Sequence, residues 1–340
     1  MQSFWRKVRY LRRAKMGNFK DFLHEGFFYK LYVPSGPTNE SLPMVVMLHG
    51  CDQDPDQFAE ETNMNQLAEK EHFIVLYPTM KRIYNPLFLD PHKSNPAGCW
   101  NWFLDENQHR GEGLPKSIVN LMRDAEKKLK KDSLSIDWTK VFAAGFSSGG
   151  AMASILGVTY PDLFSGIAVC SGLPYDAANT NLWKDPWNIA AEMVMRNGVR
   201  DPYKCGMNAF LEMQKAYSET GIKRRIPLIV FHGTNDLTVH PKNANQIIIQ
   251  WNQAHFLFDG SKGHVNTAPA SVKIETMNNG RRYSQHSYSD NNELPAIELY
   301  LIHDMEHVWS GGNKSGKFTD PLGPDASSII WDFFKGTFVT

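Results

Sequence analysis

Short apolar segments alternate with longer amphipathic segments along most of the chain. Apolar or alternating runs of strand length occur at residues 26–34, 42–50, 73–78, 141–144, 165–172, 226–233 and 296–303. Segments with helical patterns separate them, at residues 55–72, 114–131, 151–156, 241–254 and 325–335. Strands that alternate with helices and are apolar on both faces are typical of a mostly parallel sheet with helices on both sides. The pattern therefore predicts an α/β fold.

Three segments depart from this alternation. Residues 81–113 form a long irregular stretch, and such stretches are more often functional than accidental. Residues 173–225 have no strong strand pattern, and we interpret them as a small helical cap over the site. Residues 271–288 carry Asn279-Gly280 between two alternating runs, which predicts a hairpin. No repeat or linker is visible, so we expect a basic arm at 1–25 and a single domain at 26–340 with the cap inserted.

Composition and charge narrow the function classes. The chain has 340 residues and a net charge of zero, so no overall basic field exists to bind nucleic acid. No stretch approaches the ~20 apolar residues of a membrane span. Residues 1–15 carry six basic side chains and no acidic one, with Phe4 and Trp5 among them. This arm either packs on the domain or touches a granule or membrane surface. It has no apolar core of a secretory signal, which predicts a cytoplasmic location.

The strand at 141–144 runs into the pattern G-x-S-x-G, from Gly145 to Gly149, with Ser147 at its centre. A sharp turn from a strand into a helix leaves little room for side chains, and the glycines supply that room. The pentapeptide alone is common by chance. Its position between a predicted strand and a predicted helix indicates a nucleophile elbow that exposes the hydroxyl of Ser147.

Two other strand ends carry the groups that a serine nucleophile needs. Asp236 follows the strand at 226–233, and His307 follows the strand at 296–303. A histidine can remove the serine proton, and a carboxylate can orient the imidazole. The order Ser, Asp, His is that of α/β-hydrolases. His303, His232 and His49 are rival bases and Asp304 is a rival acid, but each is more simply explained as a structural residue.

An oxyanion that forms during attack needs backbone N–H donors. The N–H of Ser148, directly after the nucleophile, is one candidate donor. The N–H of Cys51, in the turn after the strand at 42–50, is the other. None of the four cysteines forms a C-x-x-C pair, and this chemistry requires neither a metal nor an organic cofactor.

Seven motifs taken together are similar to one family. They are Leu48-His-Gly-Cys-Asp-Gln53, Cys99-Trp-Asn-Trp-Phe103, Arg110-Gly-Glu-Gly113, Gly145-Phe-Ser-Ser-Gly-Gly-Ala-Met152, Ser171-Gly-Leu-Pro-Tyr175, His232-Gly-Thr-Asn-Asp236 and His307-Val-Trp-Ser-Gly-Gly312. In this order they resemble the polyhydroxybutyrate (PHB) depolymerase family of esterases, which lies beside feruloyl and acetylxylan esterases among α/β-hydrolases. The resemblance covers roughly residues 27–335.

The resemblance implies a carboxylester hydrolase with Ser147 as nucleophile, Asp236 and His307 as its partners, and Cys51 in the oxyanion turn. Trp100, Trp102, Tyr175 and Trp309 then become candidate walls for an acyl or aryl group, although Trp100 and Trp102 are equally explained as core anchors. Cys51 and Cys99 lie in two of the motifs and are candidates for a disulfide that braces the oxyanion turn. Pairing of Cys170 with Cys205 stays open.

The chain also departs from the family pattern. Its turn has Asp52 where the family usually has threonine, and residues 83–96 look longer than usual. No separate polymer-binding domain is visible, which places the polymer itself in doubt as a substrate.

The leading hypothesis is a serine carboxylester hydrolase that acts through an acyl-enzyme on poly- or oligo-3-hydroxybutyrate or related short-chain esters. A feruloyl or acetylxylan esterase is the alternative within the same class. A peptidase and a non-catalytic binding protein on a hydrolase fold are weaker alternatives. The sequence leaves the oligomeric state open.

Overall fold

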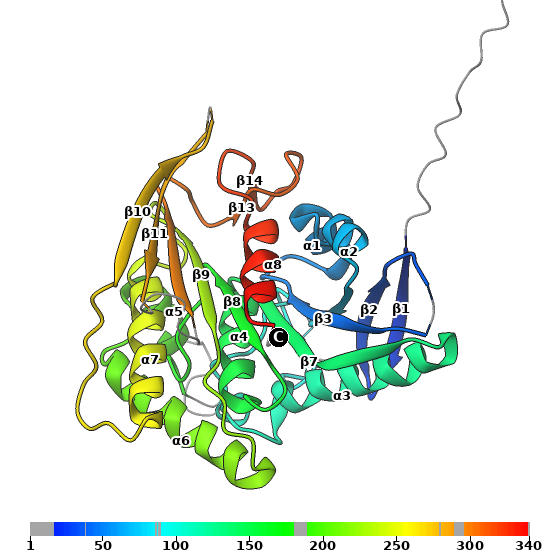
Figure 1. Cartoon of the computed structure of the whole chain (residues 1–340), viewed down its shortest axis with the longest axis horizontal. Helices are drawn as coiled ribbons and strands as arrows, with labels where there is room; N and C mark the ends of the chain where they lie inside the picture. Colours follow the sequence, from blue (N-terminus) through cyan, green and yellow to red (C-terminus); the bar gives the residue numbers. More distant parts are fainter. Residues whose placement is uncertain are drawn as a thin grey trace, which may run out of the picture.

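The computed structural model describes residues 17–37, 39–85, 87, 90–179, 189–278, 280–288 and 296–338. One ten-stranded sheet crosses the molecule, in the order β1-β2-β4-β3-β7-β8-β9-β12-β11-β10 (Figure 1). Its strands are β1 Asn18–His24, β2 Phe27–Val33, β3 Ser41–Leu48, β4 Ile74–Pro78, β7 Ser135–Phe146, β8 Gly166–Cys170, β9 Leu228–Gly233, β10 Ser271–Thr276, β11 Arg282–Ser287 and β12 Ile297–Ile302. The strands from β4 to β12 are parallel, and the two strands at either edge are antiparallel. The predicted mostly parallel sheet is confirmed.

Helices cover both faces of the sheet. They are α1 Pro55–Thr62, α2 Met64–Glu71, α3 Gly113–Leu129, α4 Ser148–Thr159, α5 Ile189–Asn197, α6 Pro202–Thr220, α7 Lys242–Phe258 and α8 Ala326–Gly336, with short 3-10 helices η2 Asp105–Gln108 and η3 Lys130–Asp132. Apolar side chains of α3, α4, α6 and α7 share one buried cluster, and those of α1, α2 and α8 share another. None of the helices in the described ranges is long and apolar enough to cross a membrane.

The second half of the strand that leads to Ser147, residues 141–146, is buried at every position, whereas residues 135–140 are mostly half-buried. In β7, Val141 and Ala143 belong to one core cluster, whereas Phe142, Ala144 and Phe146 belong to the other. Successive side chains of a strand point to opposite faces, so a strand covered on both sides is buried at every position. The elbow is therefore held from both layers of the fold.

The structure corrects two sequence-based expectations. The arm does not extend to residue 25, because Asn18–His24 pairs with β2 as an edge strand of the sheet. The basic residues 1–15 lie outside the described residues. The helix predicted over 55–72 is divided at Asn63, whose φ of 53° is left-handed and ends α1. The division leaves two short helices in place of one.

The proposed cap stays a prediction, because the structure describes only part of it. In the described part of 173–225, α6 packs against α7 and α4 in the helical layer beside the sheet. Its buried residues, such as Ala209 and Met213, join the same cluster as those of α7. Trp183 and Trp187 lie outside the described residues. The hairpin prediction holds for β10 and β11, although Asn279 in its turn also lies outside them.

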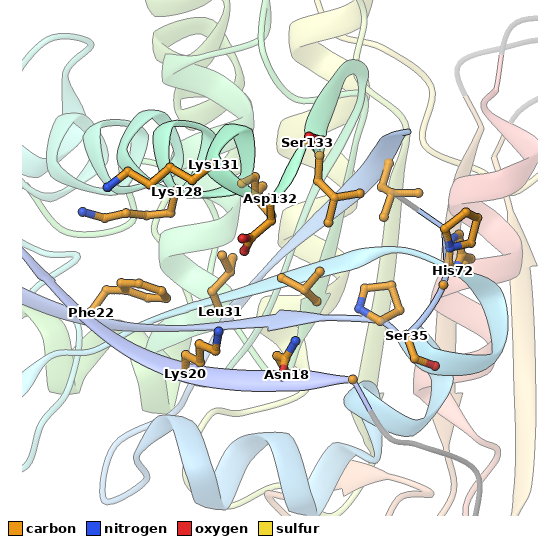
Figure 2. A pocket seen from close by; sticks show the side chains of 18 residues that line it. Asn18, Lys20, Phe22, Leu31, Ser35, His72, Lys128, Lys131, Asp132 and Ser133 are labelled. Atoms are coloured by element: carbon orange, nitrogen blue, oxygen red, sulfur yellow. The ribbon is translucent and has the colours of Figure 1, made fainter. Parts of the chain in front are cut away.

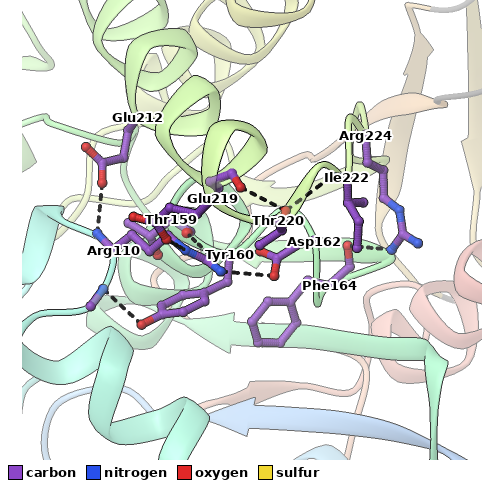
Figure 3. A network of polar contacts seen from close by, with 12 residues as sticks. Arg110, Thr159, Tyr160, Asp162, Phe164, Glu212, Glu219, Thr220, Ile222 and Arg224 are labelled. Atoms are coloured by element: carbon purple, nitrogen blue, oxygen red, sulfur yellow. Dashed lines mark hydrogen bonds and ion pairs between the residues drawn. The ribbon is translucent and has the colours of Figure 1, made fainter.

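Arg110, in one of the family-like motifs, ties α4 and α6 together (Figure 3). Its guanidinium donates two hydrogen bonds to Asp162, at 2.7 and 3.0 Å, and another to Glu219, at 2.8 Å. It also donates to the carbonyl of Thr159 at the end of α4 and lies 4.6 Å from the ring centre of Tyr160. The side chain of Asp162 is only 6% exposed, so the pair of Arg110 and Asp162 contributes most of the stabilisation from this network. Glu219 is exposed, and its pair with Arg110 contributes little.

We expect Arg110→Met to lower the free energy of unfolding by about 3 kcal/mol, because Asp162 would remain buried without its partner. Urea denaturation measures the loss. Glu219→Gln is the matched control, since breaking an exposed pair costs under about 1 kcal/mol. Equal stability of the two variants would contradict the assignment of Asp162 as the main partner.

Candidate active site

Ser147 sits at the tip of a tight turn between β7 and α4. Its backbone has φ 57° and ψ −120°, a conformation that is costly for a residue with a side chain. A Cβ on Gly145 would lie 2.1 Å from the carbonyl oxygen of Gly149, and a Cβ on Gly149 would lie 2.1 Å from that of Leu48. Only glycine fits at either position. The predicted elbow is therefore present in the backbone.

His307 lies between the nucleophile and the acid. Its Nε2 is 2.9 Å from the hydroxyl of Ser147, and its Nδ1 is 2.7 Å from a carboxylate oxygen of Asp236. The imidazole also packs on Phe146, with ring centres 4.9 Å apart. The loop between β12 and β13 (Trp309–Ser310) carries His307. The structure thus brings together the three side chains that the sequence singles out.

Asp236 has four polar neighbours inside the protein, three of which donate hydrogen bonds to it. The backbone N–H groups of Thr238 and Val239 donate to one oxygen, at 3.0 and 2.8 Å. His307 and His232 approach the other oxygen, at 2.7 and 3.3 Å. Burial opposes ionisation of the carboxyl, but the interactions with His232 and His307 outweigh it and hold the pKa of Asp236 well below its usual range. The group is therefore a carboxylate at neutral pH.

His232 is a second histidine at this carboxylate, although its position in the sequence suggests only a rival base. Its Nε2 lies 2.8 Å from the carbonyl oxygen of Val239, so Nε2 carries the proton. Its Nδ1 is buried and has no hydrogen-bond partner among the described residues. The four-residue spacing of His232 and Asp236 at the end of one strand is the sequence feature that could have indicated this contact.

The turn after β3 lies beside the elbow and is firmly held. A disulfide joins Cys51 to Cys99, and Cys51 Sγ lies 3.5 Å from the hydroxyl oxygen of Ser148. The indole N–H of Trp100 donates to the carbonyl of His49, at 3.0 Å. The side chain of Gln53 accepts from the N–H of Gly50, at 2.7 Å. Cys51 and Ser148 are therefore neighbours, as an oxyanion site needs, and their role as donors remains a prediction.

Glu61 links this turn to the loop after His307, a role that no sequence pattern indicates. Its buried carboxylate accepts from the amide of Gln53, at 2.6 Å, and from the backbone N–H of Lys317, at 2.8 Å. Its carbonyl accepts from the N–H of Asn313, at 2.8 Å. One side chain on α1 thus fixes both the oxyanion turn and the histidine loop.

Residues 27–269 match the family described as Esterase PHB depolymerase. The chain belongs to this family. His307 lies beyond the matched residues, and its place in the site rests on the geometry above.

Named relatives and solved structures agree with this membership. The chain is 30% identical over 308 residues to poly(3-hydroxyalkanoate) depolymerase C of Paucimonas lemoignei, over 88% of this chain and 62% of that protein. It is 28% identical over 232 residues to feruloyl esterase B of Thermothelomyces thermophilus, over 65% of this chain and 68% of that protein. The fold matches acetyl xylan esterase from Aspergillus awamori with a TM-score of 0.70 at 21% identity, covering 94% of this chain and all of that one. This chain thus spans under two thirds of the depolymerase.

The four aromatic residues predicted as substrate walls are core residues. The exposed fractions of Trp100, Trp102, Tyr175 and Trp309 lie between 1% and 4%. Trp309 packs edge-on against Phe58, and the hydroxyl of Tyr175 donates to the carbonyl of Gln108. Trp100 and Trp102 pack in the core, as the core-anchor alternative states, and a role of the four rings as walls of the acyl site remains a prediction.

A groove of about 750 Å³ lies away from Ser147, between β1, the segment after β2 and the C-terminal end of α3. Figure 2 shows Lys128 and Lys131 on one side of it and Lys20 on the other. Leu31 and Leu42 contribute apolar surface. None of the residues of the candidate site lines this groove. In the described ranges, no group of three or more histidine, cysteine or acidic side chains is arranged to hold a metal ion.

His49 should make the fold acid-sensitive. Burial lowers its pKa from 6.5 to about 4, so the unfolded chain binds a proton at this residue before the folded chain does. Stability contributed by neutral His49 is complete above about pH 6.5 and declines as pH falls toward 4, by about 3 kcal/mol in total. We expect His49→Gln to flatten this part of the dependence of unfolding free energy on pH. His264→Gln, at an exposed position, is the control, and equal slopes for both variants would contradict the prediction.

Proposed function

We propose that this protein is a serine carboxylester hydrolase that acts through an acyl-enzyme. The observation that supports this most directly is the unbroken chain of hydrogen bonds from Asp236 through His307 to Ser147 at the tip of an elbow. His307 Nε2 takes the proton of Ser147 while the serine oxygen attacks the ester carbonyl carbon. Asp236 holds the proton on Nδ1 and stabilises the imidazolium that results.

Collapse of the tetrahedral intermediate breaks the bond to the alkoxy oxygen. His307 returns its proton to that oxygen, and the alcohol leaves. A water molecule then attacks the acyl-enzyme with His307 again as base, which releases the carboxylic acid and restores the hydroxyl of Ser147. The backbone N–H groups of Cys51 and Ser148 are the proposed donors to the oxyanion in both halves, and each such donor contributes about 3 kcal/mol to the transition state.

For the acyl group, we propose short-chain hydroxyalkanoate esters, as polymer or oligomer, with feruloyl or acetylxylan esters as the alternative. Support for the first comes from the depolymerase relative, and support for the second from the feruloyl and acetylxylan esterases. A panel of 3-hydroxybutyrate oligomers, methyl ferulate, acetylated xylan and p-nitrophenyl butyrate, compared by kcat/KM, separates them. Turnover of ferulate with no turnover of the oligomers would overturn the first proposal. Ester turnover that survives Ser147→Ala would overturn the mechanism.

The disulfide is evidence on the kind of compartment in which the protein functions. Disulfides persist in oxidising compartments and are rare in the cytosol. The Cys51–Cys99 bond beside the oxyanion turn therefore favours an oxidising compartment over the cytoplasmic location expected from the sequence. Cys170 and Cys205 are free and buried.

The disulfide should support both stability and turnover. Replacing Cys51 and Cys99 with alanine opens a loop closed across 48 residues, which in the chain-entropy account costs about 4 kcal/mol of unfolding free energy. The oxyanion turn would lose its covalent brace, so we expect kcat to fall at least about tenfold with little change in KM. Denaturation and ester kinetics measure the two effects. Cys205→Ala is the control. Unchanged kcat in the double variant would indicate that Gln53 and Trp100 hold the turn without the bond.

A further inference from the structure

β10 ends the ten-stranded sheet on the side away from β1, and Figure 1 shows it at the margin of the fold. Among the described residues, β10 pairs only with β11, along one of its two sides. All six of its residues are exposed, and the apolar side chains of Val272 and Ile274 are 48% and 57% exposed. A strand of this kind is a template for pairing with another strand.

The hydrogen bonds around β10 define which of its backbone groups are free. The N–H of Met277 donates to the carbonyl of Arg281, which closes the hairpin. Hydrogen-bonded and non-bonded pairs alternate along antiparallel strands, so Glu275 and Lys273 bond to β11. The carbonyl of Arg282 accepts from His303 on the opposite side, as this alternation requires. The N–H and C=O groups of Val272, Ile274 and Thr276 therefore point away from the sheet.

The charges on β10 favour one register for antiparallel pairing between two copies of this strand. When two copies run antiparallel about a twofold axis at Ile274, Val272 lies opposite Thr276 and Lys273 lies opposite Glu275. Both opposite-charge pairs are then made, and the two Ile274 side chains meet on the same face. A shift by two residues along the strand puts Lys273 opposite Lys273, or Glu275 opposite Glu275. Like charges directly opposite each other are destabilising, so the strand specifies its own register.

We propose that β10 pairs with β10 of a second copy of this chain, antiparallel about Ile274, to join two sheets into one. Pairing closes the exposed edge, and opposite charges on one face and apolar side chains on the other stabilise it. The strands β8, β9, β12 and β11 separate β10 from β7, which ends directly before Ser147. Association therefore leaves each active site open.

Sedimentation velocity over a range of protein concentrations tests the proposal. The wild type should shift from monomer to dimer as concentration rises. Ile274→Pro removes an outward N–H and leaves the bonds to β11 in place, so it should remain a monomer. Lys262→Glu, on the exposed loop before β10, is the control and should dimerise like the wild type.

A charge exchange makes the test specific for the register. Lys273→Glu and Glu275→Lys should each weaken the dimer, since each places like charges opposite one another. The double exchange should restore it. Unchanged turnover of p-nitrophenyl butyrate in all variants shows that they are folded. A wild type that stays monomeric at every concentration overturns the proposal, as does a dimer that survives Ile274→Pro or a double exchange that fails to restore association.

Discussion

Replacing Ser147 with alanine should lower kcat for any ester substrate by about 10⁴-fold or more, with KM changed little. The hydroxyl is the atom that bonds to the acyl group, and no neighbouring group can take its place at the tip of the elbow. Ser148, the next hydroxyl along the chain, lies within hydrogen-bond distance of the N–H of Trp100 and is not bonded to His307. Its oxygen therefore has no base. We expect only the residual rate that oriented binding and the oxyanion donors supply.

A covalent probe makes this result specific. A fluorophosphonate should label the wild type at Ser147, as mass spectrometry of the labelled peptide measures, and should not label Ser147→Ala. Ser154→Ala is the matched control, because the hydroxyl of Ser154 is buried in α4 without a hydrogen-bond partner. That variant should keep wild-type labelling and kinetics. Labelling of Ser147→Ala at another serine would show that a serine other than Ser147 is the nucleophile. Loss of activity in Ser154→Ala would mean that helix packing, rather than the missing nucleophile, explains the result.

The parts of the site that the sequence predicts are those that depend on local chemistry. Ser147 lies in a pattern whose glycines are demanded by the backbone itself, since any side chain at Gly145 or Gly149 meets a carbonyl at 2.1 Å. Asp236 and His307 follow apolar runs that end abruptly. Because parallel strands end at the same edge of a sheet, order along the chain was enough to bring these three together.

The parts that the sequence did not predict depend on tertiary packing. The sequence alone cannot distinguish an aromatic residue that lines a pocket from one that packs in the core. Trp309 and Tyr175 are buried in the core. Glu61 is an ordinary helix residue in the sequence, and only the approach of the loops at Gln53 and Lys317 makes it a link. β1 is polar at most positions because it is an exposed edge strand, so its pattern resembles that of a loop.

The second large effect concerns the acid. Asp236→Asn should lower kcat by about 10⁴-fold while leaving substrate binding nearly intact. An amide has one acceptor oxygen and one donor nitrogen, whereas the carboxylate of Asp236 accepts hydrogen bonds from Thr238, Val239 and His307. If the amide oxygen kept its bonds to the N–H groups of Thr238 and Val239, its NH₂ would face His307. The imidazole would then turn its lone pair to the amide and carry its proton on Nε2, where it cannot accept the proton of Ser147.

The geometry also predicts how the fall in kcat caused by Asp236→Asn compares with the effects of pH and of replacing His232. Hydrogen bonds hold the pKa of Asp236 well below its usual range. The carboxyl of the wild type therefore stays ionised over the whole pH range in which activity is assayed. Acidification should therefore not reproduce the loss of the carboxylate that Asp236→Asn causes. His232→Asn removes only the longer of the two histidine contacts, at 3.3 Å, and should cost far less, roughly tenfold or under. A pH profile of kcat/KM for both variants measures the difference. If His232→Asn were as damaging as Asp236→Asn, the carboxylate would depend on His232 for its position, and the backbone donors at Thr238 and Val239 would not be sufficient to hold it.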